Sequence, residues 1–280
     1  MNVSSLINNA AALLSRAKVD SPRLCSRLLL ARVLGCSQES LLVNQDHVPA
    51  FREISLFSSL VSRRSQGEPL AYITGHKEFY GLDFVVDKNV LIPRPETELL
   101  VETAVSRYKT SQSPVFADIG TGSGILAICL ASIMPGSLAN ASDIDMAALR
   151  VARRNASIHR VQNSIIFIQS DLGRGIKQGS LDFVVSNPPY LSEDDFAEVS
   201  CEVSGFEPYH ALVSPENGLF HFRILEEISW FLLKDGGMIF LEMGQDQGKH
   251  IAEIYSRWRE IAVYKDLAGH DRVFAASKYD

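Results

Sequence analysis

The chain has 280 residues, 46% of them hydrophobic, and a formal net charge of −6. This composition excludes a disordered protein and predicts a large core shared between a main domain and a smaller one. Apolar stretches such as residues 124–134 are too short for a membrane helix, which needs roughly 18 apolar residues. The first residues lack the pattern of a secretion signal, so we expect a cytoplasmic protein with no membrane partner.

Metal and hydrolase chemistry find little support in the sequence. The four cysteines lie far apart with no C-x-x-C pair, and neither H-E-x-x-H nor G-x-S-x-G occurs. We therefore expect no metal site. Residues 1–75 carry eight basic and five acidic side chains, which is a weak positive field for a protein that neutralises phosphates. No direct nucleic-acid binding is expected.

Residues 1–75 have the apolar spacing of helices. One helix is predicted near residues 5–17. A second begins at Pro22, with Ser21 as its N-cap and Gly35 as its terminator. Two further short segments begin near Ser37 and Pro49. The pattern predicts a small helical bundle, and leaves open whether it is a structural cap or a docking module for a macromolecule.

Residues 76–92 alternate apolar and polar side chains around a turn at Gly81, which predicts a β-hairpin that links two domains. A helix should follow Pro93 and Pro95. Its first turn carries Glu96 and Glu98, which suit the positive end of a helix dipole.

Beyond Pro114, apolar strands alternate with helical segments. This order is typical of an α/β fold: a Rossmann-like, mostly parallel sheet with helices on both faces. The last two strands, around Ala268-Gly269, are expected to be antiparallel. We assign residues 93–280 to this domain.

The first strand of the predicted sheet ends in D-I-G-T-G-S-G, residues 118–124. Its glycines allow a tight turn and a close backbone approach to a ligand. Ile125 stands where a dinucleotide fingerprint would need its third glycine. The motif resembles motif I of class I S-adenosylmethionine-dependent methyltransferases, although a non-specific turn remains an alternative. The expected cofactor contacts here are Gly120, Thr121, Gly122, Ser123 and Gly124.

Two later strand ends offer further cofactor contacts. Asp143 lies 25 positions after Asp118, close to the spacing at which a carboxylate meets ribose hydroxyls in nucleotide-binding folds. Asp145 is the competing candidate, or else an N-cap. At the next strand end, Leu172 could pack on an adenine ring, and Asp171 could either accept from the adenine amino group or cap a helix.

The fourth strand ends in S-N-P-P-Y. Proline stops a strand and stiffens the backbone after it, so the motif could be only a turn. It could also hold Asn187 Oδ1 and the Pro188 carbonyl rigidly as acceptors for a planar –NH₂ group during methyl transfer. Pro189 adds stiffness, and Tyr190 could lie against the planar group. An amide and a base amine both remain open as targets.

Several stretches together resemble the HemK/PrmC family, the peptide chain release factor glutamine methyltransferases. They are G-H-K-E-F-Y-G at 75–81, L-I-P-R-P-E-T-E-L-L-V-E at 91–102, the motifs at 118–124 and 186–191, and F-E-P-Y-H-A-L-V-S at 206–214. The resemblance implies methylation of the glutamine in a Gly-Gly-Gln motif of release factors, with S-adenosylmethionine as co-substrate. It also implies that residues 120–124, Asp143, Leu172 and Asn187 contact the cofactor and that residues 187–190 hold the glutamine.

The resemblance further implies that the helical domain docks the release factor. At Leu172 the family often has an aromatic residue, so only apolar packing is expected there. We expect a monomer. The alternatives are an N6-adenine DNA or RNA methyltransferase that uses the same N-P-P-Y chemistry and, more remotely, a nicotinamide dinucleotide oxidoreductase or a non-catalytic binding protein.

Overall fold

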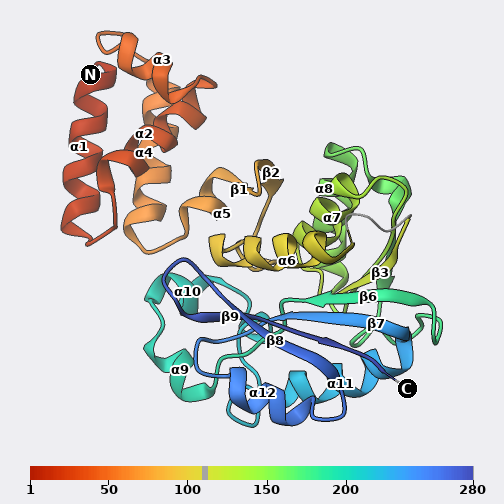
Figure 1. Ribbon diagram of the computed structural model, residues 1–280. Helices are drawn as coiled ribbons and strands as arrows, with labels where there is room; N and C mark the ends of the chain where they lie inside the picture. Colours follow the sequence, from red (N-terminus) through yellow and green to blue (C-terminus); the bar gives the residue numbers. More distant parts are fainter. Residues whose placement is uncertain (109–112, 280) are drawn as a thin grey trace. The chain divides into compact units, whose positions relative to one another are not determined.

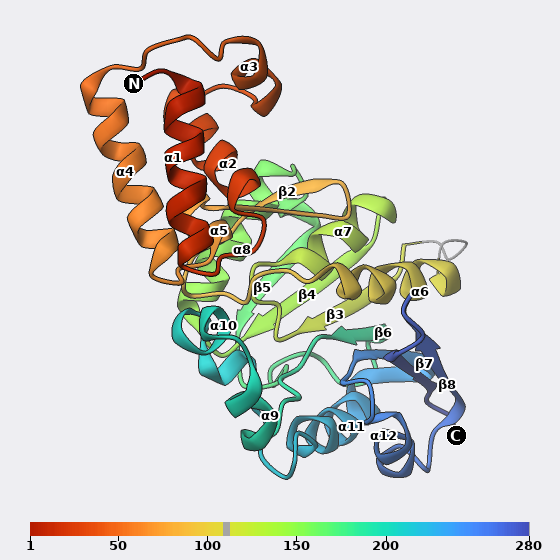
Figure 2. The same cartoon turned by 90° about the vertical axis from the view of Figure 1, so that its left-hand side faces the viewer.

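The computed structural model describes residues 1–108 and 113–279 and divides into two compact units (Figures 1 and 2). Unit 1 consists of Met1–Gly75 and Ser200–Phe206, and unit 2 of His76–Val199 and Glu207–Asp280. Residues 109–112 and 280 of the predicted catalytic domain lie outside the described residues. One segment departs from the predicted boundaries, because residues 200–206 group with the helical unit.

Unit 1 is helical, as its apolar spacing predicted. Its elements are α1 (Val3–Arg16), α2 (Pro22–Leu34), α3 (Gln38–Val43), α4 (Phe51–Ser65), α5 (Leu70–Thr74) and α10 (Cys201–Phe206). Leu14, Leu29 and Leu30 are fully buried in its core. Gly35 ends α2 in the left-handed conformation, which confirms the predicted terminator.

Ser21 stands at the predicted N-cap position of α2, but its side chain does not cap the helix. Ser21 does precede α2, but it has φ 47° and its side chain makes no capping hydrogen bond. An N-cap side chain normally reaches the first turn from an extended backbone, and the left-handed conformation turns it away. Ser37, by contrast, is extended and accepts from the Ser40 amide at the start of α3.

A buried arginine joins α10 to the rest of unit 1. Arg64 of α4 is only 6% exposed, and its Nη2 donates to Glu202 Oε2 at 2.8 Å. Its Nη1 donates to the Glu68 carbonyl. Because a buried guanidinium requires partners, these contacts explain why a segment distant in sequence belongs to this unit.

Unit 2 begins with the predicted hairpin, β1 (His76–Phe79) and β2 (Leu82–Val85), followed by the 3₁₀ turn η1 (Pro95–Thr97) and α6 (Glu98–Tyr108). The buried Asn155 side chain ties this hairpin to the glycine motif. Its Oδ1 accepts from the Val85 amide, and its Nδ2 donates to the Val85 and Ser123 carbonyls.

A seven-stranded sheet forms the centre of unit 2, in the order β5-β4-β3-β6-β7-β9-β8. The strands are β3 (Val115–Ile119), β4 (Leu138–Asp143), β5 (Ile165–Gln169), β6 (Leu181–Ser186), β7 (Leu233–Glu242), β8 (Arg259–Lys265) and β9 (Asp271–Ser277). The first five are parallel, and β9 pairs antiparallel with β7 and β8. The predicted antiparallel ending is therefore confirmed.

The helices of unit 2 cover both faces of the sheet (Figure 1). Besides α6, they are α7 (Ile125–Ile133), α8 (Met146–Ile158), α11 (Phe220–Leu232) and α12 (Gly248–Ile254). The short helix α9 (Glu193–Glu198) has no buried residue, and short 3₁₀ turns lie at Gln162–Ser164 and Tyr209–Ala211. α6, α7 and α8 pack on one face, and α11 and α12 on the other.

The two cores result from the alternation of side chains along a strand. In β6, Phe183 enters the core under α6 and α7, while its neighbour Val184 enters the core over α11. Phe116 stacks on Phe183 with ring centroids 4.7 Å apart. Within the described residues, no helix is both long and apolar enough to span a bilayer.

Candidate active site

A cavity opens at the carboxyl ends of β3 and β6, where the strand order changes direction. Crossovers leave the sheet to opposite sides at such a point, and ligands of open α/β sheets bind there. The glycine motif follows β3, and Asn187 follows β6. The buried Ser186 hydroxyl donates to the Ile119 carbonyl at 2.6 Å, which joins the two strand ends.

Asp118 organises the glycine turn from inside the protein. Its fully buried Oδ2 accepts from Thr121 Oγ1 at 2.6 Å and from the Ala127 amide at 3.1 Å. These bonds fix the loop to the first turn of α7. Burial, partly opposed by these two bonds, raises the pKa of Asp118 to about 7.

The three glycines of the motif all have positive φ, 74° at Gly120, 53° at Gly122 and 85° at Gly124. Gly120 and Gly122 have open space where a Cβ would stand, so their backbone is accessible to a ligand. At Gly124 a Cβ would lie 3.0 Å from Ile128 Cδ1 and 3.1 Å from Ala152 Cβ. Gly124 therefore allows close packing between α7 and α8, and it is not among the described residues that line the cavity.

Asp143 and Asp145 have different surroundings. Asp145 caps α8, because its Oδ1 accepts from the Ala147 amide at 2.7 Å. Asp143 lines the cavity, with Oδ2 accepting from the Gly122 amide and Oδ1 from the Asp145 amide, both at 2.9 Å. Each Asp143 oxygen keeps acceptor capacity for a hydroxyl. Burial raises the pKa of Asp143.

Residues 120–123, Asp143, Leu172 and Asn187 all line this cavity, so the structure brings together the predicted cofactor contacts apart from Gly124. Leu172 has φ 51°, a conformation that a leucine rarely adopts. Such strain concentrates at ligand sites. Asp171 also lines the cavity and caps no helix.

The S-N-P-P-Y residues divide between the cavity and the protein interior. Asn187 and Pro189 line the cavity, and the Asn187 Nδ2 donates to Thr97 Oγ1 at 3.3 Å. Pro188 and Tyr190 are not among the described residues that line it. The Tyr190 hydroxyl instead donates to Glu242 Oε1 at 3.4 Å. Burial raises the pKa of Tyr190.

Several residues that line the cavity were not predicted from the sequence. Arg94 and Thr97 come from the I-P-R-P-E-T-E stretch, and His210 and His221 come from the segments after residue 206. Burial lowers the pKa of His221, whose Nδ1 lies 2.7 Å from Ser214 Oγ. The signal that could have found Arg94, Thr97 and His210 is the family resemblance of the two stretches that contain them.

One ion pair connects these two stretches. Arg94 Nη2 donates to Glu207 Oε1 at 2.6 Å, and the Ile92 amide donates to Glu207 Oε2 at 3.1 Å. The Glu207 side chain is 1% exposed. Glu207 therefore holds the I-P-R-P segment in place beside the cavity.

Chemically, the cavity offers a diol acceptor at Asp143, apolar walls at Leu91, Ile125 and Leu172, and an amide beside two prolines. Such a set suits a nucleoside and a second planar polar group. The described residues contain no cluster of three or more histidine, cysteine or carboxylate side chains placed for a metal ion.

Comparisons with known proteins identify both units. Residues 5–75 match the PrmC N-terminal domain, and residues 95–202 match the methyltransferase small domain. Among solved structures, a methyltransferase from Pyrococcus furiosus has a TM-score of 0.52 and 19% identity over 80% of this chain and all of that one. The hMettl16 catalytic domain in complex with the MAT2A 3'UTR hairpin 6 has a TM-score of 0.58 at 15% identity, covering 79% and 82%. These two likenesses show the class I methyltransferase fold.

Curated relatives are much closer in sequence. The release factor glutamine methyltransferase of Nitratidesulfovibrio vulgaris is 37% identical, over 99% of this chain and 95% of its own. That of Rhodopirellula baltica is 38% identical over 92% and 90%, and that of Koribacter versatilis 37% identical over 99% of each chain. With such identity over nearly its whole length, the chain belongs to the family of release factor glutamine methyltransferases.

Proposed function

We propose that this enzyme transfers a methyl group from S-adenosylmethionine to the side-chain amide nitrogen of the glutamine in the Gly-Gly-Gln motif of peptide chain release factors. The observation that carries the proposal is the position of Asn187, at the carboxyl end of β6 and in one cavity with Asp143 and the glycine turn. A methyl donor and a planar amide could thus meet within one site.

Cofactor binding is explained by the chemistry of the lining residues. Asp143 would accept from the two ribose hydroxyls, because both its oxygens keep free lone pairs beside their backbone donors. The open backbone at Gly120 and Gly122 allows close approach of the amino-acid portion, and Leu172 supplies an apolar wall for the adenine. When bound, the sulfonium supplies the electrophilic methyl carbon.

The protein's task is then to aim and activate a weak nucleophile. In this proposal Asn187 Oδ1 and the Pro188 carbonyl accept the two N–H groups of the glutamine amide. As the N–C bond forms and the C–S bond breaks, those acceptors stabilise positive charge that develops on the nitrogen. The electrons of the C–S bond leave with sulfur as S-adenosylhomocysteine. The amide proton becomes acidic only after methylation and can pass to water, so no strong base is needed beside Asn187.

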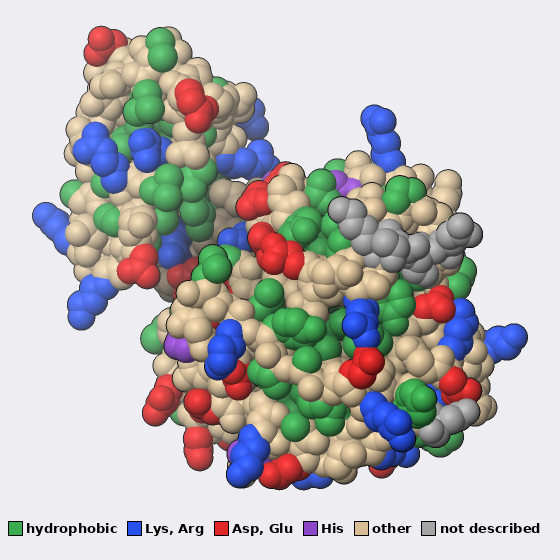
Figure 3. Space-filling view, viewed as in Figure 1, with side chains coloured by type: hydrophobic (Ala, Val, Ile, Leu, Met, Phe, Trp, Pro, Cys, Tyr) green, Lys and Arg blue, Asp and Glu red, His purple; other side chains and the backbone are tan. Residues whose placement is uncertain are grey.

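The proposal includes a protein partner, a monomeric enzyme and a cytoplasmic location, where release factors act. Unit 1 is assigned to docking of the release factor. On the face drawn in Figure 3, basic and acidic side chains are interspersed on both units rather than gathered into a basic stripe. That distribution favours a protein substrate over the alternative of a nucleic-acid adenine methyltransferase.

The deciding experiment offers the protein and labelled S-adenosylmethionine to purified release factors, and separately to DNA and RNA. Label is expected on the release factor, at the Gly-Gly-Gln glutamine by mass spectrometry. A release factor with that glutamine changed to alanine should stay unlabelled. Label on nucleic acid alone would overturn the proposal.

The variant Asn187→Ala tests whether Asn187 acts on the substrate amide or on the cofactor. It should keep cofactor affinity within a few-fold by calorimetry and abolish transfer, because the lost acceptor acts on the substrate amide. Asn140→Ala is the matched control, since Asn140 donates to the Phe116 carbonyl inside the sheet and does not line the cavity. Equal losses of binding and transfer in Asn187→Ala would contradict the assigned role.

A further inference from the structure

A buried carboxylate stands directly behind the S-N-P-P-Y residues without lining the cavity. Glu242 is the last residue of β7, next to β6 in the sheet, and it is 1% exposed. Burying an ionisable group is costly unless it is paired, so its presence here requires a reason. Neither the family resemblance nor the cavity lining assigns it a role.

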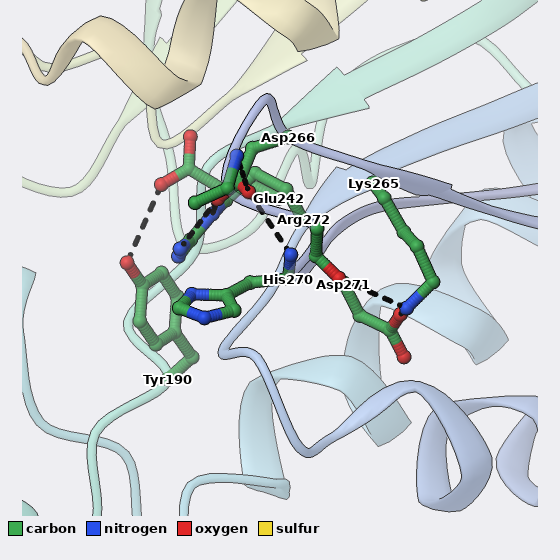
Figure 4. A network of polar contacts seen from close by, with 9 residues as sticks. Tyr190, Glu242, Lys265, Asp266, His270, Asp271 and Arg272 are labelled. Carbon is green, nitrogen blue, oxygen red and sulfur yellow. Dashed lines mark hydrogen bonds and ion pairs between the residues drawn. The ribbon is translucent and has the colours of Figure 1, made fainter.

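One residue of the candidate site bonds to Glu242, and a second lies near it. The Tyr190 hydroxyl donates to Glu242 Oε1, as Figure 4 shows. The Thr97 side chain lies near enough to Glu242 to lower the pKa of that carboxyl, and among the described residues the buried Glu242 Oε2 has no hydrogen-bond partner. The carboxylate thus has acceptor capacity left, and Thr97 has the hydroxyl that can use it.

Thr97 connects this carboxylate to the amide of Asn187. A hydroxyl has one proton to donate and lone pairs with which to accept. If the Thr97 proton points at ionised Glu242, only lone pairs remain for Asn187. Asn187 must then present its –NH₂ to Thr97. This agrees with the structure, in which Asn187 Nδ2 donates to Thr97 Oγ1 at 3.3 Å. Its Oδ1 is consequently free to face the substrate.

We propose that Glu242 is a positioning residue that, through Thr97, fixes the orientation of the Asn187 amide and, directly, the Tyr190 hydroxyl. This inference rests on the proposed function, because it explains how the acceptor for the glutamine amide is kept in its working orientation. A neutral side chain at position 242 would let the Thr97 proton turn toward Asn187. The amide could then flip and offer the substrate a donor where it needs an acceptor.

The surroundings of Glu242 place this switch near neutral pH. Burial raises its pKa to about 7, while Thr97, Arg272 and Tyr190 lower it and the charge of Glu96 raises it further. Arg272 is held by Asp266, its Nη2 donating to Asp266 Oδ2 at 3.1 Å (Figure 4). The folded enzyme should therefore lose transfer activity as pH falls through about 7, when Glu242 takes up a proton.

The first test compares Glu242→Gln with wild type in methyl transfer to a purified release factor. We expect kcat/KM at pH 8 to fall about tenfold to a hundredfold, as for a misplaced reacting group, with cofactor affinity unchanged within a few-fold. The acidic limb near pH 7 should disappear from the kcat/KM profile. Glu226→Gln is the matched control, because Glu226 is also buried but pairs with Arg257 and Trp258 away from the cavity.

The second test uses Thr97 and does not depend on Glu242→Gln folding. Thr97→Val should lose as much turnover as Glu242→Gln, and Thr97→Ser should recover it because the hydroxyl returns. The double variant Thr97→Val, Glu242→Gln should be no worse than either single variant, as for residues that act as one unit. Thr103→Val, which removes a buried hydroxyl bonded to the Leu99 carbonyl, should keep wild-type turnover.

The outcomes separate this inference from the function on which it rests. Wild-type protein that leaves every release factor unlabelled contradicts the proposed function. Active wild-type protein whose Glu242→Gln variant keeps the acidic limb and near-normal turnover contradicts the inference alone. So does a Thr97→Ser variant that is as impaired as Thr97→Val.

Discussion

Removing Arg94 should lower the unfolding free energy much more than removing Glu207, its ion-pair partner. The Glu207 side chain is 1% exposed, whereas that of Arg94 is 33% exposed. Among the described residues, Arg94→Met leaves the buried carboxylate with the Ile92 amide as its one donor, which should cost about 3–5 kcal/mol of unfolding free energy. Glu207→Gln keeps an acceptor for that amide and leaves Arg94 accessible to water, so about 1–2 kcal/mol is expected.

The double variant Arg94→Met, Glu207→Gln sharpens this prediction. It removes the cation and the buried charge together, so its unfolding free energy should lie above that of Arg94→Met alone. Urea unfolding followed by tryptophan fluorescence is the suitable assay, because both tryptophans, Trp230 and Trp258, lie in unit 2 with the ion pair. If Arg94→Met costs no more than Glu207→Gln, or the two losses simply add, burial of Glu207 is not the controlling factor.

Three further predictions concern the cofactor side of the cavity. Gly124→Ala should destabilise unit 2 by about 1–3 kcal/mol, because φ 85° is strained for alanine and its Cβ would meet Ile128 and Ala152. The control Gly269→Ala, with φ 86° and open space around its Cβ, should lose less unfolding free energy in the same urea assay. Asp143→Ala should weaken cofactor binding by about 1–3 kcal/mol in calorimetry. Asp145→Ala should lose only a helix cap and keep its cofactor affinity. The reverse result would exchange the roles of the two residues. Because the pKa of Asp118 is raised from 3.8 to about 7, the folded protein holds a proton that the unfolded chain releases, so this residue makes stability fall as pH rises from about 4 to about 7. Asp118→Asn should flatten that part of the stability curve, and parallel curves for variant and wild type would contradict the assignment.

The fold was predictable because its signals are local and repeated. Alternating strands and helices predicted the parallel sheet, and the turn at Ala268-Gly269 predicted the antiparallel ending, where Asp266 and the Gly269 amide form the turn. Short elements were less visible. α9 and α10 have six residues each and were not predicted, since a helix of so few residues carries too little apolar periodicity.

The parts of the site that need an unusual backbone conformation were predictable from the sequence. The parts that depend on contacts between residues far apart in the sequence were not. A cluster of glycines or two consecutive prolines can be recognised in a sequence, so the motifs at 118–124 and 186–190 could be predicted as parts of a site. Thr97, Glu207 and Glu242 gave no such signal of their own. Each acquires its role from a contact with a residue more than fifty positions away, and only folding supplies that contact.

The assignment of residues 200–206 to unit 1 affects the order in which the chain is completed during synthesis. Most of the helical unit lies within the first 75 residues and can begin to fold as soon as they emerge. Its final helix, α10, is made only after β3 to β6 of the sheet. Arg64 therefore lacks its carboxylate partner Glu202 until well over a hundred further residues have been synthesised. The helical unit, which comes first in the sequence, therefore cannot be finished until four strands of the sheet of unit 2 have been made.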